Sequence, residues 1–111
     1  MRIFYSSAAD RADVPCSAPV DDSLDTALAV FRGLDARRGF LGVALDDRFH
    51  LQVLRERQGV RVELLDSKIP ALDACVADSD FAESLIRAAA LGHDVFEIAR
   101  ASHYEWKHTD L

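Results

Sequence analysis

The chain has 111 residues, half of them hydrophobic, and carries a formal net charge of −6 at pH 7. This length and hydrophobic share predict a single domain, 1–111, with a real core, and argue against a disordered chain. The acidic charge argues against direct binding of nucleic acid, and no apolar run is long enough to predict a membrane span.

The cysteines and the first residues bear on the compartment. Cys16 and Cys75 are too few for a disulfide framework, and free thiols fit a reducing environment. The first 16 residues contain no continuous apolar stretch of the kind found in signal peptides. We therefore expect a cytoplasmic protein.

The first segment, 1–19, shows no clear period. Pro15 and Pro19 favour a loop, and only residues 2–5 have the composition of a short strand. We expect this segment to be loosely ordered or to add an edge strand.

A helix is predicted over residues 23–32. Ser23 is a good N-cap, and apolar residues recur at i, i+3, i+4 and i+7 from Leu24 to Phe31. Gly33 follows where a left-handed C-cap is expected.

The strongest pattern lies in residues 40–66, where three β-favouring runs are separated by Asp46-Asp47-Arg48 and by Gln58-Gly59. Such runs predict two consecutive hairpins. For the first hairpin, a three-residue loop pairs Leu41 with Val53 and keeps one face apolar, which a two-residue loop does not.

For the second hairpin, a two-residue Gln58-Gly59 loop predicts that Arg55 pairs with Val62. The same register pairs Glu56 with Arg61 as a cross-strand ion pair. Together the two registers predict a buried face made of Leu41, Val43, Leu45, Phe49, Leu51, Val53, Val62 and Leu64.

The last 45 residues predict more helix than strand. Residues 74–77 are a candidate strand, helices are expected over 80–91 and from 95 to about 102, and the tail 103–111 fits neither period. The predicted fold class is α+β: a three-stranded antiparallel meander with an N-terminal helix and one or two C-terminal helices. Residues 74–77 would make the sheet four-stranded.

Candidate protein-binding residues fall in three groups. The second face of the sheet mixes polar and apolar side chains, residues 63–97 carry eight acids against two bases, and the tail is aromatic. Trp106 either covers Leu54 or Leu65 or belongs to an interface. The candidate residues are His50, Gln52, Leu54, Glu63, Leu65, Asp78, Asp80, Glu83, Tyr104 and Trp106.

No pattern predicts a catalytic, cofactor or metal site. His103 and His108 are five residues apart, which suits neither helical nor strand metal ligation, and His50 and His93 stand alone. The paired carboxylates have simpler explanations as helix caps and turns. We expect no cofactor, no metal and no catalytic residues.

The order of helix, FLGVALDDRFHLQVL hairpin, VRVELLD strand and ESLIRAAALG helix resembles small bacterial immunity proteins of polymorphic toxin systems. The resemblance covers about residues 22–92, with Leu51-Gln52 matching a Leu-Gln pair that is common in the second strand of the hairpin. It departs at Asp46-Asp47-Arg48, where a Gly is common, and in the added tail. The resemblance implies a cytoplasmic binder that covers the active site of a toxin.

Three hypotheses follow for the function. The first is a non-enzymatic protein-binding domain, an immunity-type inhibitor of a basic toxin, with no direct contact to nucleic acid or membrane. The second is a self-associating structural or regulatory domain, a homodimer formed through the open face of the sheet. The third, and least supported, is a small enzyme that uses a cysteine or a histidine.

Overall fold

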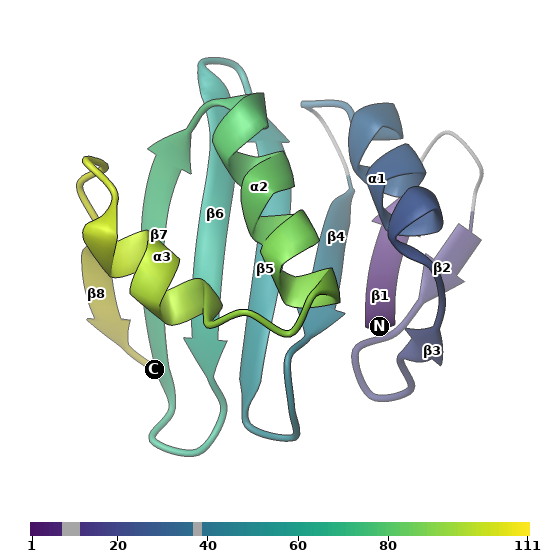
Figure 1. The fold of residues 1–111 in the computed structure, drawn as a ribbon, viewed down its shortest axis with the longest axis horizontal. Coiled ribbons are helices and arrows are strands. Elements are labelled where there is room, and N and C mark those ends of the chain that lie inside the picture. Colours follow the sequence, from purple (N-terminus) through teal and green to yellow (C-terminus); the bar gives the residue numbers. More distant parts are fainter. Residues whose placement is uncertain (8–11, 37–38) are drawn as a thin grey trace.

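In the residues described by the computed structural model, 1–7, 12–36 and 39–111, eight strands form one antiparallel sheet (Figure 1). The strands lie in the order β2-β1-β4-β5-β6-β7-β8, and β3 also pairs with β1. The strands are β1 (Arg2–Ser7), β2 (Ala12–Val14), β3 (Val20–Asp21), β4 (Phe40–Ala44), β5 (Phe49–Glu56), β6 (Gly59–Asp66), β7 (Ala71–Ala77) and β8 (Lys107–Asp110).

The prediction of a three- or four-stranded sheet is therefore wrong, although the α+β class is confirmed. β1, expected at most as an edge, lies inside the sheet and pairs with β4 through Ile3 and Val43. β2 and β3 have three and two residues, too few for an alternating pattern. All four residues of β8 are exposed. Because neither side of β8 is buried, its sequence does not alternate between apolar and polar residues. Residues 8–11 of the predicted loose segment lie outside the described residues.

The three predicted helices are confirmed, with small shifts at their ends: α1 (Leu24–Gly33), α2 (Ser79–Ala90) and α3 (Val95–Ala101). Ser23 caps α1, and its hydroxyl accepts a hydrogen bond from the N–H of Thr26 at 3.1 Å. Asp78 caps α2, and Asp80, the first residue of the predicted helix 80–91, lies in its first turn. α1 ends at Gly33 itself, so Gly33 is not the left-handed cap.

The predicted register of the first hairpin is confirmed. Leu41 pairs with Val53, and the N–H of Leu45 donates to the carbonyl of Phe49 at 2.9 Å. A three-residue loop, Asp46-Asp47-Arg48, joins the strands.

The predicted register of the second hairpin is wrong by two residues. Arg55 pairs with Val60, and Arg61 lies opposite Leu54 instead of Glu56. Gly59 is not in the turn; it begins β6, where an added Cβ would lie 2.6 Å from the Ala77 carbonyl oxygen. Because a shift of two residues preserves the alternation of side chains, the predicted faces still hold.

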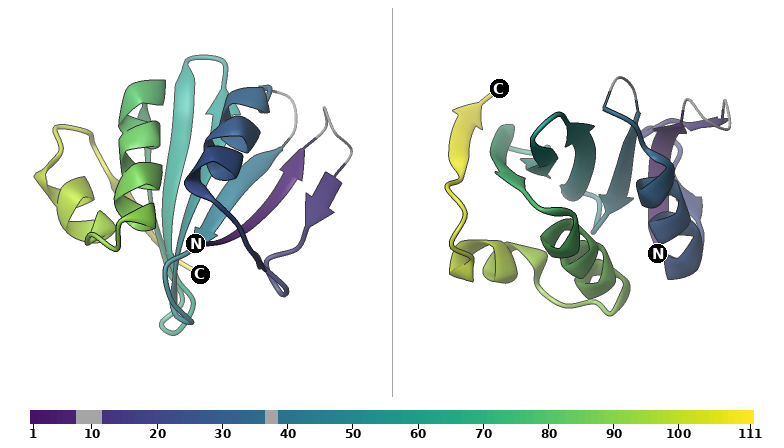
Figure 2. Two further views of the ribbon diagram at one scale, coloured as in Figure 1. Left: turned by 45° about the vertical axis from the view of Figure 1, so that its right-hand side comes forward. Right: turned by 90° about the horizontal axis from the view of Figure 1, so that it is seen from above.

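The helices bury one face of the sheet (Figure 2). Phe31 of α1 and Leu85 and Ile86 of α2 have no exposed surface and belong to the same apolar cluster as the strands. The strand residues in this cluster that were predicted as core are at most 3 % exposed: Leu41, Val43, Leu51, Val53, Val62 and Leu64. Leu45 and Phe49 lie at the end of the core and are half-buried.

Gly59→Ala is expected to lower the free energy of unfolding by about 1–3 kcal/mol. Gly59 has a φ of 153°, and the added Cβ would press on the backbone of β7. Gly33→Ala is the control, because no atom lies within 4 Å of its Cβ position and alanine favours a helix. Denaturant unfolding would contradict this account if the two variants lost equal stability.

Candidate binding surfaces

One face of the sheet carries none of the three helices, and we call it the open face (Figure 2). Pairing registers place alternate residues of β1 and β4 to β7 on it. Its central members are Phe4, Gly42, His50, Gln52, Leu54, Arg61, Glu63, Leu65, Leu72, Ala74 and Val76. None of them belongs to the apolar cluster beneath the helices.

The centre of the open face is a polar network around Glu63. Gln52 Nε2 donates to Glu63 Oε1 at 3.1 Å, and Arg61 Nε donates to Glu63 Oε2 at 3.0 Å. The Glu63 side chain is only 13 % exposed. Both carboxylate oxygens therefore have partners, and the charge is compensated without any ligand.

Apolar side chains surround this network unevenly. On the β1 side, the Phe4 ring packs over Gly42 and contacts His50 edge-on, with 5.6 Å between ring centroids. On the β5–β7 side, Leu54 and Leu65 are half-buried and Val76 is 47 % exposed. The uncovered apolar surface thus lies over β5, β6 and β7.

The structure brings together five of the predicted binding residues. His50 pairs with Leu65, Gln52 with Glu63, and Leu54 lies one step further along β5. All five lie on the open face, as the alternation of the sequence predicted.

The other five predicted residues lie elsewhere. Asp78 Oδ1 caps α2 by accepting from the N–H of Phe81 at 2.7 Å, and the Tyr104 ring packs on Phe81 at 4.7 Å. Asp80, in the first turn of α2, is exposed. Trp106 Nε1 donates to Ser102 Oγ at 3.1 Å.

Trp106 and Glu83 both make their contacts on the side of the sheet that the helices cover. Trp106 lines a small hollow of about 140 Å³ with Leu64 and Phe96, so it does not cover Leu54 or Leu65. Glu83 accepts from Arg32 at 2.7 Å, which ties α2 to α1 and lowers the pKa of the Glu83 carboxyl.

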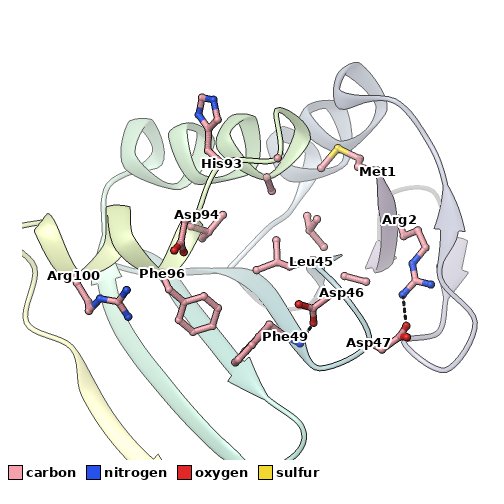
Figure 3. Close-up of a pocket in the computed structure, with 15 residues that line it drawn as sticks. Met1, Arg2, Leu45, Asp46, Asp47, Phe49, His93, Asp94, Phe96 and Arg100 are labelled. Atoms are coloured by element: carbon pink, nitrogen blue, oxygen red, sulfur yellow. Dashed lines mark hydrogen bonds and ion pairs between the residues drawn. The ribbon is translucent and has the colours of Figure 1, made fainter.

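A second surface, which the sequence did not predict, is a hollow of about 860 Å³ at one end of the sheet (Figure 3). We call it the end groove. It lies between the β4–β5 loop, the α2–α3 linker and the start of β1. Its floor includes Leu45, Phe49 and Phe96, and Asp46, Asp47, Asp94 and Arg100 line its rim.

Two carboxylates of the rim are fixed by backbone hydrogen bonds. Asp46 Oδ1 accepts from the N–H groups of Phe49 and Arg48, both at 2.7 Å, and these bonds lower the pKa of Asp46. Asp94 Oδ1 caps α3 by accepting from the N–H of Glu97 at 3.2 Å. Asp46 thus stabilises the turn between β4 and β5, and Asp94 stabilises the start of α3. Both residues also border the end groove.

In the described ranges, the other charged side chains of the rim are not held by backbone hydrogen bonds. Asp47 is fully exposed and lies 3.6 Å from Arg2. Arg100 extends toward Phe96 and has no hydrogen bond or ion pair among the described residues, whereas the His93 ring projects away (Figure 3). Arg2 also lines the groove, so three carboxylates stand against two guanidinium groups, a net side-chain charge of −1.

The aromatic floor is held by an ion pair between the partly exposed Arg48 and the buried Asp66. The Phe49 ring contacts Phe96 with 4.9 Å between centroids, and the Arg48 guanidinium lies 4.7 Å from the Phe49 centroid. Arg48 donates to both oxygens of Asp66, at 2.8 and 2.6 Å. Chiefly through this contact, the pKa of Asp66 falls to about 2.

The cysteines and His108 show no catalytic arrangement within the described residues. Burial raises the pKa of the Cys75 thiol to about 11, so it is protonated at neutral pH. His108 lies between Asp73 and Asp110, at 2.6 and 2.9 Å, which raises the pKa of His108 and joins β8 to β7. In the described ranges no three His, Cys, Asp or Glu side chains are placed to hold a metal ion.

No described helix is both long and apolar enough to cross a membrane. Comparison with known proteins found no matching family model, no matching curated protein and no matching solved structure. The function therefore has to be argued from the open face and the end groove.

Arg48→Met is expected to make the protein more sensitive to acid. A carboxyl whose folded-state pKa is lowered stabilises the fold above its ordinary pKa of 3.8, and this stability is lost as the pH falls toward 2. Without Arg48, the half-loss of structure by circular dichroism should move to higher pH. Arg2→Met, which removes only the exposed pair with Asp47, is the control; equal acid midpoints for both variants would contradict the account.

Proposed function

We propose that this chain is a non-enzymatic protein-binding domain, an immunity-type inhibitor, that holds a basic partner protein at the end groove. The observation that carries the proposal is the combination of an aromatic floor, Phe49 and Phe96, with an acidic rim. A lysine or arginine side chain fits such a site, because its stem packs on apolar surface while its charged end stays near carboxylates.

The size of the end groove agrees with this use. About 860 Å³ lies within the range of roughly 300–1,000 Å³ that is usual for ligand sites. It is ample for one or two basic side chains on a protruding loop of a partner.

Long-range charge supports a basic partner. The whole chain carries −6, so a positively charged protein is attracted from a distance. Within the acidic region predicted from the sequence, Asp66 and Glu83 already pair with arginines, Asp73 pairs with His108, and Asp78 caps α2. The acids of the end-groove rim are therefore better candidates for the contact than the start of α2.

The resemblance to immunity proteins supplies the biological setting of the proposal. A toxin that acts on nucleic acid needs a basic cleft, and an acidic surface can occupy such a cleft. In this hypothesis the chain acts in the cytoplasm of the cell that produces the toxin, and the partner is a protein rather than nucleic acid or membrane.

Asp47→Lys and Arg100→Gln are expected to change partner affinity in opposite directions. Asp47→Lys should weaken binding about tenfold or more, which is about 1.4 kcal/mol, and Arg100→Gln should tighten it because a repelling cation is lost. The binding partner to use is the product of the gene adjacent to this one, and titration calorimetry at low and moderate salt gives the affinity.

Asp80→Lys is the matched control, with the same change of charge at the start of α2. If Asp80→Lys weakens binding and Asp47→Lys does not, the contact is not at the end groove. If no complex forms even at low salt, and co-expression does not relieve growth arrest caused by the partner, the inhibitor hypothesis fails.

A further inference from the structure

The open face has an apolar area that no element of the described ranges covers. Val76 is 47 % exposed and lies opposite Arg61, with the half-buried Leu54 on the far side of Arg61. The half-buried pair Leu65 and Leu72 lies on the other side of the Glu63 network. The helices, the C-terminal tail and Trp106 all lie on the other side of the sheet or at its edge (Figure 2).

Charge on the open face is nearly balanced, unlike that of the whole chain. Strand residues that point to this side carry three positive charges against four negative ones, a net of −1 compared with −6 overall. The charged residues are Arg2, Arg61, Lys107, Asp13, Asp21, Glu56 and Glu63. Two copies that meet here avoid most of the repulsion that they feel elsewhere, whereas a strongly basic partner gains little.

A second molecule can cover the polar centre of the open face without leaving the Glu63 charge unpaired. Both oxygens of Glu63 already accept hydrogen bonds, from Gln52 and Arg61. A second molecule over this network would therefore leave no carboxylate oxygen without a partner, and the large penalty for an unpaired buried charge does not arise.

The sheet is also large enough for a stable interface. Seen face-on, along the shortest axis, the molecule spans 33 by 31 Å (Figure 1). A stable protein interface buries about 800 Å² on each partner, so a dimer formed here uses most of this outline and not the apolar side chains of β5 to β7 alone.

We infer that the open face is a dimer interface, and that its occupant is the open face of a second copy of this chain. The two sheets pack face to face, with the apolar side chains of β5 to β7 in contact. The apolar side chains of β5 to β7 lie away from the β4–β5 loop and the α2–α3 linker that line the end groove, and the two surfaces share Arg2 and Ala44.

Sedimentation velocity over about 1 to 300 µM, the range for a dimer of micromolar affinity, tests this inference. The mass of the wild type should rise from 12.3 kDa toward twice that value. Val76→Lys should raise the dimer dissociation constant at least about tenfold, since it buries a second cation opposite Arg61. Val76→Glu, which faces Arg61, should raise it less. Circular dichroism checks that both variants are folded.

Leu91→Lys is the control, because Leu91 is a 70 % exposed leucine at the end of α2, on the helix side. It should leave the dimer unchanged, and added salt should not dissociate the dimer, although salt weakens binding of a basic partner. A wild type that stays monomeric throughout the range overturns the inference. So does a dimer that survives both Val76 variants, because its interface is then not the open face.

Discussion

The constraint on which this structure depends is that the helices cover only one of the two faces of the sheet. All three helices pack on that face, and side chains such as Phe31, Leu85 and Ile86 fill the space between the layers. Hydrophobic burial on one side stabilises the fold but leaves a wide second face in contact with water. The composition of the open face reflects this: a compensated charge network at its centre, aromatic rings closing one side, and a small apolar area left over β5 to β7.

The end groove follows from the same arrangement. α2 packs on the sheet and ends at Ala90, Gly92 follows with a positive φ, and α3 starts after Asp94, so the helical layer is interrupted at the edge of the core. Phe49 and Phe96 meet in this gap, and the Arg48–Asp66 pair holds the floor in place. Asp46 stabilises a turn and Asp94 caps a helix, and both carboxylates face solvent. The same residues therefore stabilise the fold and contribute negative charge to the rim.

Much of the fold could be predicted from the sequence because burial imposes a period on it. The α1 and α2 stripes and the alternation in β4 to β6 follow from contact with the core, and the two-residue error at Gly59 did not change the faces. β2, β3 and β8 could not be predicted, because short or exposed strands are held by pairing with neighbours rather than by an apolar pattern. The end groove could not be predicted either, since it joins residues of the β4–β5 loop to residues some 50 positions later.

The one-sided sheet can be tested most directly with two adjacent residues of β7. Cys75 is 5 % exposed under the helices, whereas Val76 next to it points to the open face and is 47 % exposed. In a Cys16→Ala, Val76→Cys variant at low micromolar concentration, the rate of thiol modification can be followed for each cysteine by mass spectrometry. Our account predicts that Cys75 reacts at least about 100-fold more slowly than the new thiol, because it is buried and protonated. Equal rates at the two positions would contradict it.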